Sequence, residues 1–267
     1  MNIDAPIGVL DSGVGGLSVM KYLHQMLPCE DFIYLGDTAR TPYGSRPEAE
    51  IRSFVCEMLD WFETQGIKQV VLACNTITML GIDTLKEGHS YYFIGMSKGE
   101  KLLAEASIKK KVGVFATEFT ISTQAHKKAI EAYDPSVKVY PMACPDFVPL
   151  IEGEHLACEH LTNCIRTYAN PLKEAGIDAL ILSCTHYPFV REQVQKEFGP
   201  DVRIIDPAEA TSELAIKQLK AAGLYKKEGS GRVRICCTRD LPRVKRLAAL
   251  MLPLEDCTFE EISLKQA

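Results

Sequence analysis

The stretches GIKQVVLACNT at residues 66–76 and GIDALILSCTH at residues 176–186 are two copies of one pattern, and the second begins 110 residues after the first. Each opens with Gly-Ile, continues through an apolar run and ends on a cysteine followed by hydrogen-bonding residues. Continuous aliphatic runs are typical of strands covered on both faces of a parallel sheet. The pattern therefore predicts an α/β fold in which Cys74 and Cys184 lie at the carboxyl ends of equivalent strands, where open α/β sheets bind ligands.

The composition is that of an ordinary globular protein. The chain has 267 residues, of which 46% are hydrophobic and 24% charged, and its formal net charge of −5 gives no reason to expect nucleic acid or a membrane as partner. No apolar run approaches the ~20 residues that span a bilayer. The start, MNIDAPIGVLDSG, leads directly into a strand, and the ten cysteines include no CxxC pair. We therefore predict a cytoplasmic protein with free thiols and no zinc site.

A second repeat predicts two similar lobes. The strand IGVL at 7–10 leads into the small polar turn DSGVGG, and KVGVFA at 111–116 leads into a similar turn. The C-terminal segment has no cysteine strand of its own, so we expect it to pack onto the first half. The predicted architecture is a first α/β lobe of residues 1–97 plus 208–267 and a second of residues 98–207. Each is expected to be a mostly parallel sheet flanked by helices, with the active site in the cleft between the two pseudosymmetric lobes.

Helical spacing of apolar residues predicts helices at 17–27, 77–87, 120–132 and 156–175. The glycine-rich turn that precedes the first of them matches a dinucleotide fingerprint only weakly, because no full G-x-G-x-x-G is present. It would allow backbone N–H groups to approach an anion, and it is also compatible with a strand–helix turn that binds nothing.

Two equivalent cysteines suit the removal and return of a proton at the α-carbon of an amino acid. A thiolate is a base whose protonation state is easily tuned near neutrality. Inversion of the α-carbon requires one group to take the proton from one face and another to deliver a proton to the opposite face. Cys74 and Cys184, one as thiolate and one as thiol, could do this in either direction and exchange roles in each turnover.

Polar neighbours of the cysteines are candidate helpers. His186 lies two residues after Cys184, so extended backbone would place both side chains on one side, where an imidazolium could hold the thiolate or relay its proton. It could equally be a histidine satisfied within a turn. Asp11 could act likewise beside Cys74, bind the substrate ammonium or cap a helix. We also expect the loop Thr41-Pro42-Tyr43-Gly44 to contact the ligand. Neutral donors for carboxylates, each of which could instead cap a helix, are Ser12, Asn75, Thr76, Thr117, Thr120 and Thr185.

Together these motifs resemble the cofactor-independent glutamate racemases of the aspartate/glutamate racemase superfamily. The matching stretches are DSGVGGLSV at 11–19, GDTARTPYG at 36–44, ACNT at 73–76, ATEFT at 116–120, ACPDFVPLIEGE at 143–154 and CTHYP at 184–188. The resemblance implies two pseudosymmetric α/β lobes. It also implies interconversion of L- and D-glutamate for bacterial peptidoglycan, with no cofactor and no metal.

The resemblance also assigns roles to individual residues. Cys74 is similar to the base that deprotonates D-glutamate, and Cys184 to the base that acts on L-glutamate. Asp11 and His186 resemble their respective helpers, and Asp37 and Glu152 fall at supporting acidic positions. Positions that bind substrate in the family are occupied here by Asp11, Ser12, Tyr43, Gly44, Asn75, Thr76, Thr185 and His186.

The chain departs from the family pattern at three places. Ile77 follows ACNT where a small residue is usual, Ser183 replaces a common glycine, and GMSKGEK at 95–101 replaces an acidic run. Ile77 and Met96 would enlarge apolar groups near the cleft, which bears on substrate breadth more than on two-base chemistry.

Several alternatives stay open at this point. Within the racemases, aspartate is the second candidate substrate. A thiol hydrolase or transferase using Cys184 and His186 belongs to a different class, and it would leave Cys74 unexplained. A pair of non-catalytic ligand-binding lobes is a third alternative. The expected partner is a small-molecule substrate, and a homodimer is compatible with the sequence.

Overall fold

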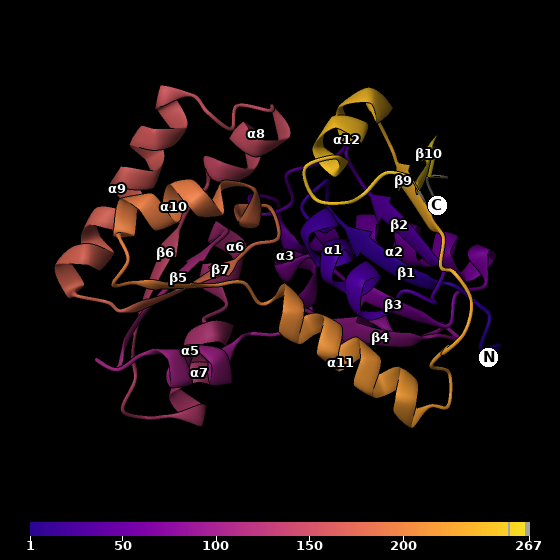
Figure 1. The fold of residues 1–267 in the computed structure, drawn as a ribbon, viewed down its shortest axis with the longest axis horizontal. Coiled ribbons are helices and arrows are strands. Elements are labelled where there is room, and N and C mark those ends of the chain that lie inside the picture. The colour runs from indigo at the N-terminus through magenta and orange to yellow at the C-terminus, as the bar shows by residue number, and fades with distance from the viewer. Residues whose placement is uncertain (256, 265–267) are drawn as a thin grey trace. The chain divides into compact units, whose positions relative to one another are not determined.

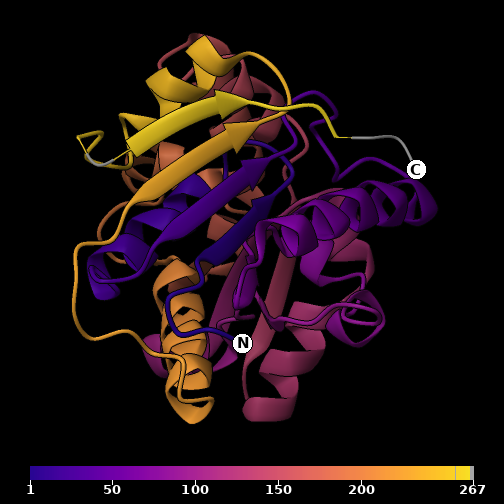
Figure 2. The same ribbon diagram turned by 90° about the vertical axis from the view of Figure 1, so that its right-hand side faces the viewer.

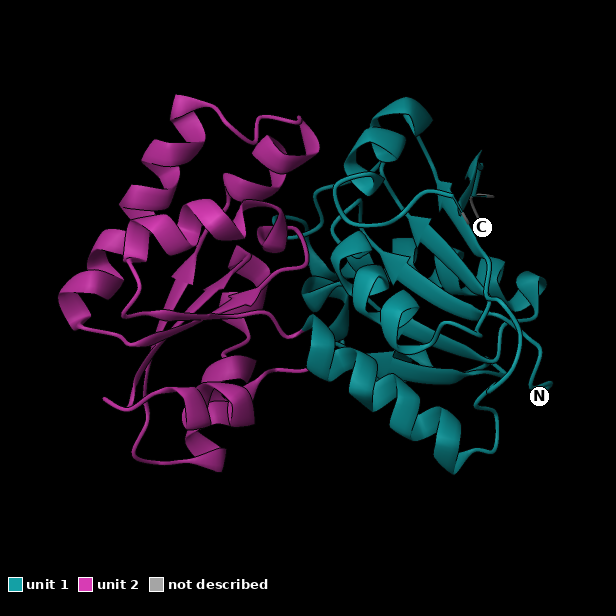
Figure 3. Cartoon of the chain, viewed as in Figure 1, with its two compact units in different colours: residues 1–96, 208–267 teal, residues 97–207 magenta. Residues whose placement is uncertain are grey.

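Each of the two units into which the chain divides is built around one parallel sheet (Figures 1 and 3). The computed structural model describes residues 1–255 and 257–264. The first unit contains residues 1–96 together with the described residues from 208 onward, and the second contains residues 97–207. Across the described residues, none of the helices has the length and apolar character needed to cross a membrane.

The first unit contains a six-stranded sheet in the order β10-β9-β2-β1-β3-β4, and all of its pairings are parallel. Its strands are β1 (Ile7–Asp11), β2 (Phe32–Gly36), β3 (Gln69–Leu72), β4 (Tyr92–Gly95), β9 (Val233–Cys237) and β10 (Cys257–Glu261). Its helices are α1 (Leu17–Met26), α2 (Glu48–Gln65), α3 (Asn75–Thr78), α4 (Ile82–Leu85), α11 (Ala208–Ala221) and α12 (Leu241–Ala248). Because β9 pairs with β2, the C-terminal segment extends this sheet, as the yellow strands beside the indigo ones show in Figure 2.

The second unit contains a four-stranded parallel sheet in the order β6-β5-β7-β8. Its strands are β5 (Lys111–Ala116), β6 (Lys138–Ala143), β7 (Ala179–Ser183) and β8 (Arg203–Ile205). Its helices are α5 (Glu100–Ala106), α6 (Glu118–Ser122), α7 (Ala125–Tyr133), α8 (Phe147–Glu152), α9 (Glu159–Ala175) and α10 (Arg191–Phe198), with a 3₁₀ turn at Tyr187–Val190. One core cluster draws on α8, α9 and α10 and another on α5 and α7, so the strands are covered on both faces.

The two sheets share one strand order. In chain order the central strands run 2-1-3-4 in the first unit (β2-β1-β3-β4) and again in the second (β6-β5-β7-β8), so β3 and β7 are equivalent. This order reverses direction between the first and third strands, and open α/β sheets bind ligands outside the carboxyl ends of the strands at such a point. The predicted α/β fold with two helix-flanked parallel sheets is confirmed, and the cysteine strands occupy the switch position in both sheets.

The doubled sequence stretch makes the same local structure twice. Gly66 and Gly176 follow α2 and α9 with φ of 64° and 74°, the left-handed conformation that ends a helix at little cost for glycine. The next residue, isoleucine in both copies, packs against a glycine of the neighbouring strand. A Cβ atom on Gly8 or Gly113 would lie only 2.8 Å from that isoleucine's Cδ1. The Gly-Ile opening of each copy therefore fixes how a helix leads into the cysteine strand.

Two of the predicted helices are interrupted. The segment 77–87, predicted as one helix, forms α3 and α4, because Gly81 has a φ of 91° that no continuous helix permits. The segment 120–132 is likewise divided into α6 and α7 at Gln124, whose φ is 55°. In each unit, one short helix therefore ends soon after the chain leaves the carboxyl edge of the sheet. A second helix begins after the residue with positive φ. Strand β10 had no counterpart among the predicted elements.

A buried ion pair ties together distant segments of the first unit. Lys68, just before β3, is 0% exposed, and its Nζ donates to Glu30 Oε2 at 2.5 Å, to the Ile3 carbonyl at 2.6 Å and to the Leu224 carbonyl at 3.0 Å. Removal of one partner from a buried pair leaves an uncompensated charge. This cluster therefore fixes the starting end of the first cysteine strand.

We expect the variant Glu30→Gln to lower the free energy of unfolding by about 3–5 kcal/mol, because the Lys68 ammonium would stay buried without its counter-charge. Urea denaturation followed by circular dichroism measures the loss. The matched control is Asp83→Asn, which breaks the exposed Lys86–Asp83 pair and should leave the free energy of unfolding almost unchanged. Equal effects of the two variants would contradict the stabilising role of the buried pair.

Candidate active site

The first half of the candidate site lies at the carboxyl ends of β1 and β3. Cys74 follows β3, is buried, and its thiol donates to the Ser12 hydroxyl over 3.6 Å. Asp11 ends β1 and is completely buried, and its Oδ1 accepts a 2.8 Å hydrogen bond from the Gly13 amide. The structure therefore brings Asp11, Ser12 and Cys74 to one edge of the sheet. Ser12 contacts the Cys74 thiol directly, and the pairing of Asp11 with Cys74 stays a prediction.

Asn75 is the most informative polar residue of this half-site. It begins α3 directly after Cys74 and is 2% exposed. Within the described part of the chain, neither its side-chain oxygen nor its nitrogen has a hydrogen-bond partner. Leaving a buried amide unsatisfied costs free energy, so such a group in a native protein binds a ligand, an ion or an ordered water. Thr76, also buried, lies beside it.

The Asp37 carboxylate organises the loop that contains Tyr43. Asp37 follows β2 and is fully buried; the Tyr43 hydroxyl donates to its Oδ2, Arg40 Nε donates to the same oxygen at 2.5 Å, and Thr238 donates to Oδ1 at 2.8 Å. Burial, followed by the Asp37 charge, raises the pKa of Tyr43 well above its ordinary value, so this phenol stays neutral. Asp37 thus fixes the loop that carries Pro42, Tyr43 and Gly44 rather than standing alone as a free acid.

The second half of the candidate site is a line of three buried groups at the carboxyl end of β7. The Cys184 sulfur lies 3.9 Å from His186 Nδ1, and His186 Nε2 lies 2.7 Å from Glu152 Oε1. Cys184, His186 and Glu152 are 6%, 2% and 5% exposed. Glu152 ends α8, so this helix delivers the carboxylate to the histidine. The structure therefore adds Glu152 to the pair of Cys184 and His186 that the sequence had already suggested.

The protonation of His186 is set by opposing effects. Burial disfavours the imidazolium, but the hydrogen bonds and negative charges of Cys184 and Glu152 outweigh it and raise the pKa of His186 well above 6.5. The arrangement therefore keeps a positive charge on the His186 ring, 3.9 Å from the Cys184 sulfur.

Three threonines add neutral hydrogen-bonding groups to the second half-site. Thr117 follows β5, and its hydroxyl accepts from the Thr120 amide at 3.3 Å and lies 3.1 Å from the Thr120 hydroxyl, so it caps α6. Thr185 is buried between Cys184 and His186. The capping alternative thus holds for Thr117, whose hydroxyl donates to the Thr120 hydroxyl while it accepts from the Thr120 amide.

Cys144 is a further buried thiol near this half-site. Burial, followed by the negative charge of Cys184, raises the pKa of Cys144 well above its ordinary value. The Tyr187 hydroxyl donates to the Cys144 carbonyl at 3.0 Å and holds this segment against the chain that follows Cys184. Cys144 is thus a neutral thiol that helps to shape the surroundings of Cys184. Its place within the motif at 143–154 was the available signal.

Comparison with known proteins agrees with this geometry. A family model described as Asp/Glu/Hydantoin racemase matches residues 7–215. Glutamate racemase from Trichormus variabilis is 42% identical over 221 residues, which make up 82% of this chain and 75% of that protein. The crystal structure of a glutamate racemase from Bacillus anthracis is 33% identical, with a TM-score of 0.89 over 97% of this chain and 98% of that one. The structure from Francisella tularensis, in complex with D-glutamate, is 31% identical, with a TM-score of 0.88 over 99% and 100% of the two chains.

The chain belongs to the Asp/Glu/hydantoin racemase family, and it is therefore an isomerase. Within that family, the resemblance to glutamate racemases predicted from its motifs is confirmed.

We expect replacement of Glu152 by glutamine to lower the pKa of His186, because burial would then be opposed by Cys184 alone. The sign follows: His186 would lose its proton at a lower pH, so activity should decline earlier as the pH rises through about 6.5 and above. NMR titration of the His186 ring, assigned with a His186→Gln sample, measures the shift directly. Glu159→Gln, an exposed residue at the start of α9, is the control, and an unchanged His186 titration in Glu152→Gln would contradict the assignment.

Proposed function

We propose that this protein interconverts L- and D-glutamate by direct proton transfer between the α-carbon and two cysteine sulfurs, without a cofactor. The observation that carries the proposal is the equivalence of β3 and β7. Each ends at the switch point of its own sheet with a buried cysteine that has a polar partner. Two such thiols match a reaction in which a proton leaves one face of a carbon and arrives on the other.

In the proposed reaction, one cysteine enters as thiolate and the other as thiol. The thiolate takes the α-proton, so the C–H bond breaks and its electron pair stays on the carbon as a carbanion. The second thiol then delivers its proton to the opposite face, which forms the new C–H bond and leaves that sulfur as thiolate. Cys184 would take the proton of L-glutamate and Cys74 that of D-glutamate. The two sulfurs exchange protonation states in each turnover, so no other acid or base is consumed.

The partners of the two cysteines would act differently. His186, held by Glu152 at 2.7 Å, would support the thiolate of Cys184 through its positive charge. Ser12 would stabilise the Cys74 thiolate by a neutral hydrogen bond. Asp11 is proposed to assist Cys74 or to bind the substrate ammonium, and Asp37 to act indirectly by holding the loop of Tyr43.

Hydrogen-bonding groups around both cysteines would bind the carboxylates of the substrate. Asn75 is the strongest of them, because its buried amide offers a donor and an acceptor that nothing in the described part of the chain uses. Neutral donors suit this task, since they hold an anion without adding a titrating group. The other proposed substrate contacts are Ser12, Pro42, Tyr43, Gly44, Thr76, Thr117, Thr120, Thr185 and His186.

Aspartate is the competing substrate, and Ile77 and Met96 bear on it because both are buried near the substrate-binding segments. Circular dichroism of glutamate, aspartate and other amino acids incubated with the enzyme would separate these possibilities; the proposal expects the fastest loss of signal with glutamate. A hydrolase built on Cys184 and His186 would act without Cys74, so the Cys74 variant below also tests that class.

The biological setting belongs to the same proposal. We propose that the enzyme supplies D-glutamate for peptidoglycan and works in the cytoplasm, where its ten cysteines, none of which forms a disulfide in the described residues, would stay reduced. We propose a homodimer as its assembly. Sedimentation of the purified protein measures the mass. A monomer at working concentrations would contradict the proposed homodimer and leave the proposed reaction unaffected.

Each of the variants Cys74→Ser and Cys184→Ser should lose racemisation by about 10²- to 10⁴-fold, because a positioned acid or base contributes rate factors of this size. In deuterium oxide, Cys74→Ser should still exchange the α-proton of L-glutamate and Cys184→Ser that of D-glutamate, in both cases without inversion. Proton NMR of each enantiomer measures exchange separately from racemisation.

The control for both variants is Cys56→Ser, which changes an exposed thiol on α2 and should leave both rates as they are. Full racemisation by either active-site variant would overturn the two-base assignment. Exchange of the opposite enantiomers would reverse the proposed roles of Cys74 and Cys184.

We expect Asn75→Ala to lose about 1.5–3 kcal/mol of transition-state stabilisation, the usual worth of a hydrogen bond to a charged group, as a lower kcat/KM for glutamate. The free energy of unfolding should not fall, because the Asn75 amide has no hydrogen-bond partner in the described part of the chain. Asn163→Ala, on the exposed face of α9, is the matched control. A destabilised Asn75→Ala enzyme with unchanged kcat/KM would show that the amide is structural.

A further inference from the structure

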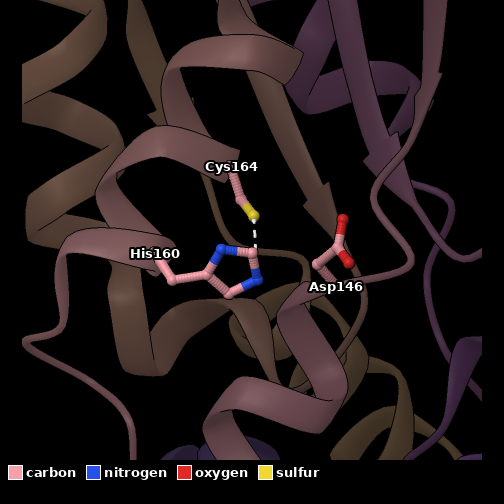
Figure 4. A group of neighbouring side chains, drawn as sticks. All are labelled: Asp146, His160 and Cys164. Carbon is pink, nitrogen blue, oxygen red and sulfur yellow. Dashed lines mark hydrogen bonds between the residues drawn. The ribbon is translucent and has the colours of Figure 1, made fainter.

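A second group of chemically reactive side chains lies in the second unit, apart from the three residues of the Cys184 line. Asp146, His160 and Cys164, drawn in Figure 4, each offer one potential ligand atom, and these atoms all lie within 4.8 Å of one another. The Cys164 sulfur lies 3.8 Å from His160 Nε2. Neither the proposed racemisation nor the packing of the sheet requires these three residues together.

The positions of the three residues follow from two adjacent helices. His160 and Cys164 are four residues apart in α9, so they lie on one face of the helix a single turn from each other. Asp146 immediately precedes α8, which packs against α9. The cluster therefore joins the start of α8 to the first turns of α9.

The carboxylate of the cluster is held by a neighbouring tyrosine. The Tyr168 hydroxyl, one turn beyond Cys164 on α9, donates to Asp146 Oδ2. The Tyr168 ring packs edge-on against Phe147, with ring centroids 5.3 Å apart. Metal-binding carboxylates are typically oriented by such outer hydrogen bonds.

We propose that Asp146, His160 and Cys164 form a binding site for a divalent transition-metal ion of the zinc class. One thiolate, one imidazole nitrogen and one carboxylate oxygen are the ligands that zinc prefers, whereas magnesium and calcium select oxygen alone. Three protein ligands leave a fourth position for water, and His160 is exposed, so an ion can enter from solvent. The spacing of the cysteines in the sequence did not reveal this site, because only one of its ligands is a cysteine.

Metal binding at this site would be coupled to a proton. A thiol binds a metal ion as the thiolate, so binding at Cys164 would release a proton. The affinity should therefore decrease as the pH falls.

The metal site is independent of the proposed racemisation, since the two-base reaction uses no metal. Its structural consequence would be stabilisation, because an ion that binds only the folded chain raises the melting temperature. The helix that begins next to Asp146 ends at Glu152, the partner of His186. The ion would therefore strengthen the helix that supports the Cys184 line without touching the reacting groups.

Cobalt(II) is a suitable probe, because a cobalt–thiolate bond gives a charge-transfer band in the near ultraviolet. After treatment with EDTA, the full-length protein should bind one equivalent of Co²⁺ with this band and should racemise its substrate without the metal. Cys164→Ser should lose the band. Cys184→Ser and the exposed-thiol control Cys56→Ser should keep it.

Zinc affinity, measured by competition with a chromophoric chelator, tests the other groups. Tyr168→Phe should weaken binding by about 10- to 100-fold, as loss of an outer partner does, and His160→Gln should weaken it further. His24→Gln, in the last turn of α1, is the control and should bind as the parent does. Circular dichroism would show whether Cys164→Ser folds. If it does not, His160→Gln still tests the site.

Two results would overturn the proposal. One is a parent protein that binds neither Co²⁺ nor Zn²⁺. The other is a cobalt band that disappears in Cys184→Ser and survives in Cys164→Ser, which would assign the ion to the proposed catalytic thiol. Neither result alters the test of the racemase, which is read from α-proton exchange.

Discussion

The structure depends on one constraint: a cysteine must follow a fully buried central strand at the point where the strand order of a parallel sheet reverses. All residues of β3 and β7 are buried, so a shift in register would place each side chain in a site packed around a different one. The sulfur positions are therefore fixed by the two cores rather than by flexible loops. The left-handed glycines at 66 and 176 and the close packing at Gly8 and Gly113 repeat the same support in both units.

Within this repeated frame, the environments of the two sulfurs differ. Cys74 has a hydroxyl partner in Ser12, whereas Cys184 has a histidine that is itself paired with a carboxylate. A hydroxyl and an imidazolium differ as partners of a thiolate, because only the imidazolium adds a positive charge of its own. The duplicated backbone thus supplies equivalent positions, and different side chains contact the sulfur in each unit.

Much of this arrangement could be predicted from the sequence, because strong local signals carry it. The paired Gly-Ile-to-Cys stretches predicted the two buried strands, and the motifs predicted the individual site residues. Contacts between distant segments were not predictable. The residues around Glu152 do not indicate that its Oε1 lies 2.7 Å from His186 Nε2. The breaks at Gly81 and Gln124 were also missed, since apolar spacing continues through both while the backbone leaves helical geometry. The local sequence pattern determines which residues form strands and helices, whereas tertiary packing determines which side chains come into contact.

Thermodynamics limits what the unequal partners of the two cysteines can change. Enantiomers in water have equal free energies, so the equilibrium constant between them is one. The two directions of a racemase must then have equal kcat/KM, however different the two thiols are. The His186–Glu152 pair and Ser12 can therefore change how kcat and KM are divided in each direction, and which protonation state of the free enzyme predominates, but they cannot favour one product. An imperfect repeat is compatible with racemisation for this reason: each half needs only to reach its own face of the α-carbon with a sulfur in the right protonation state.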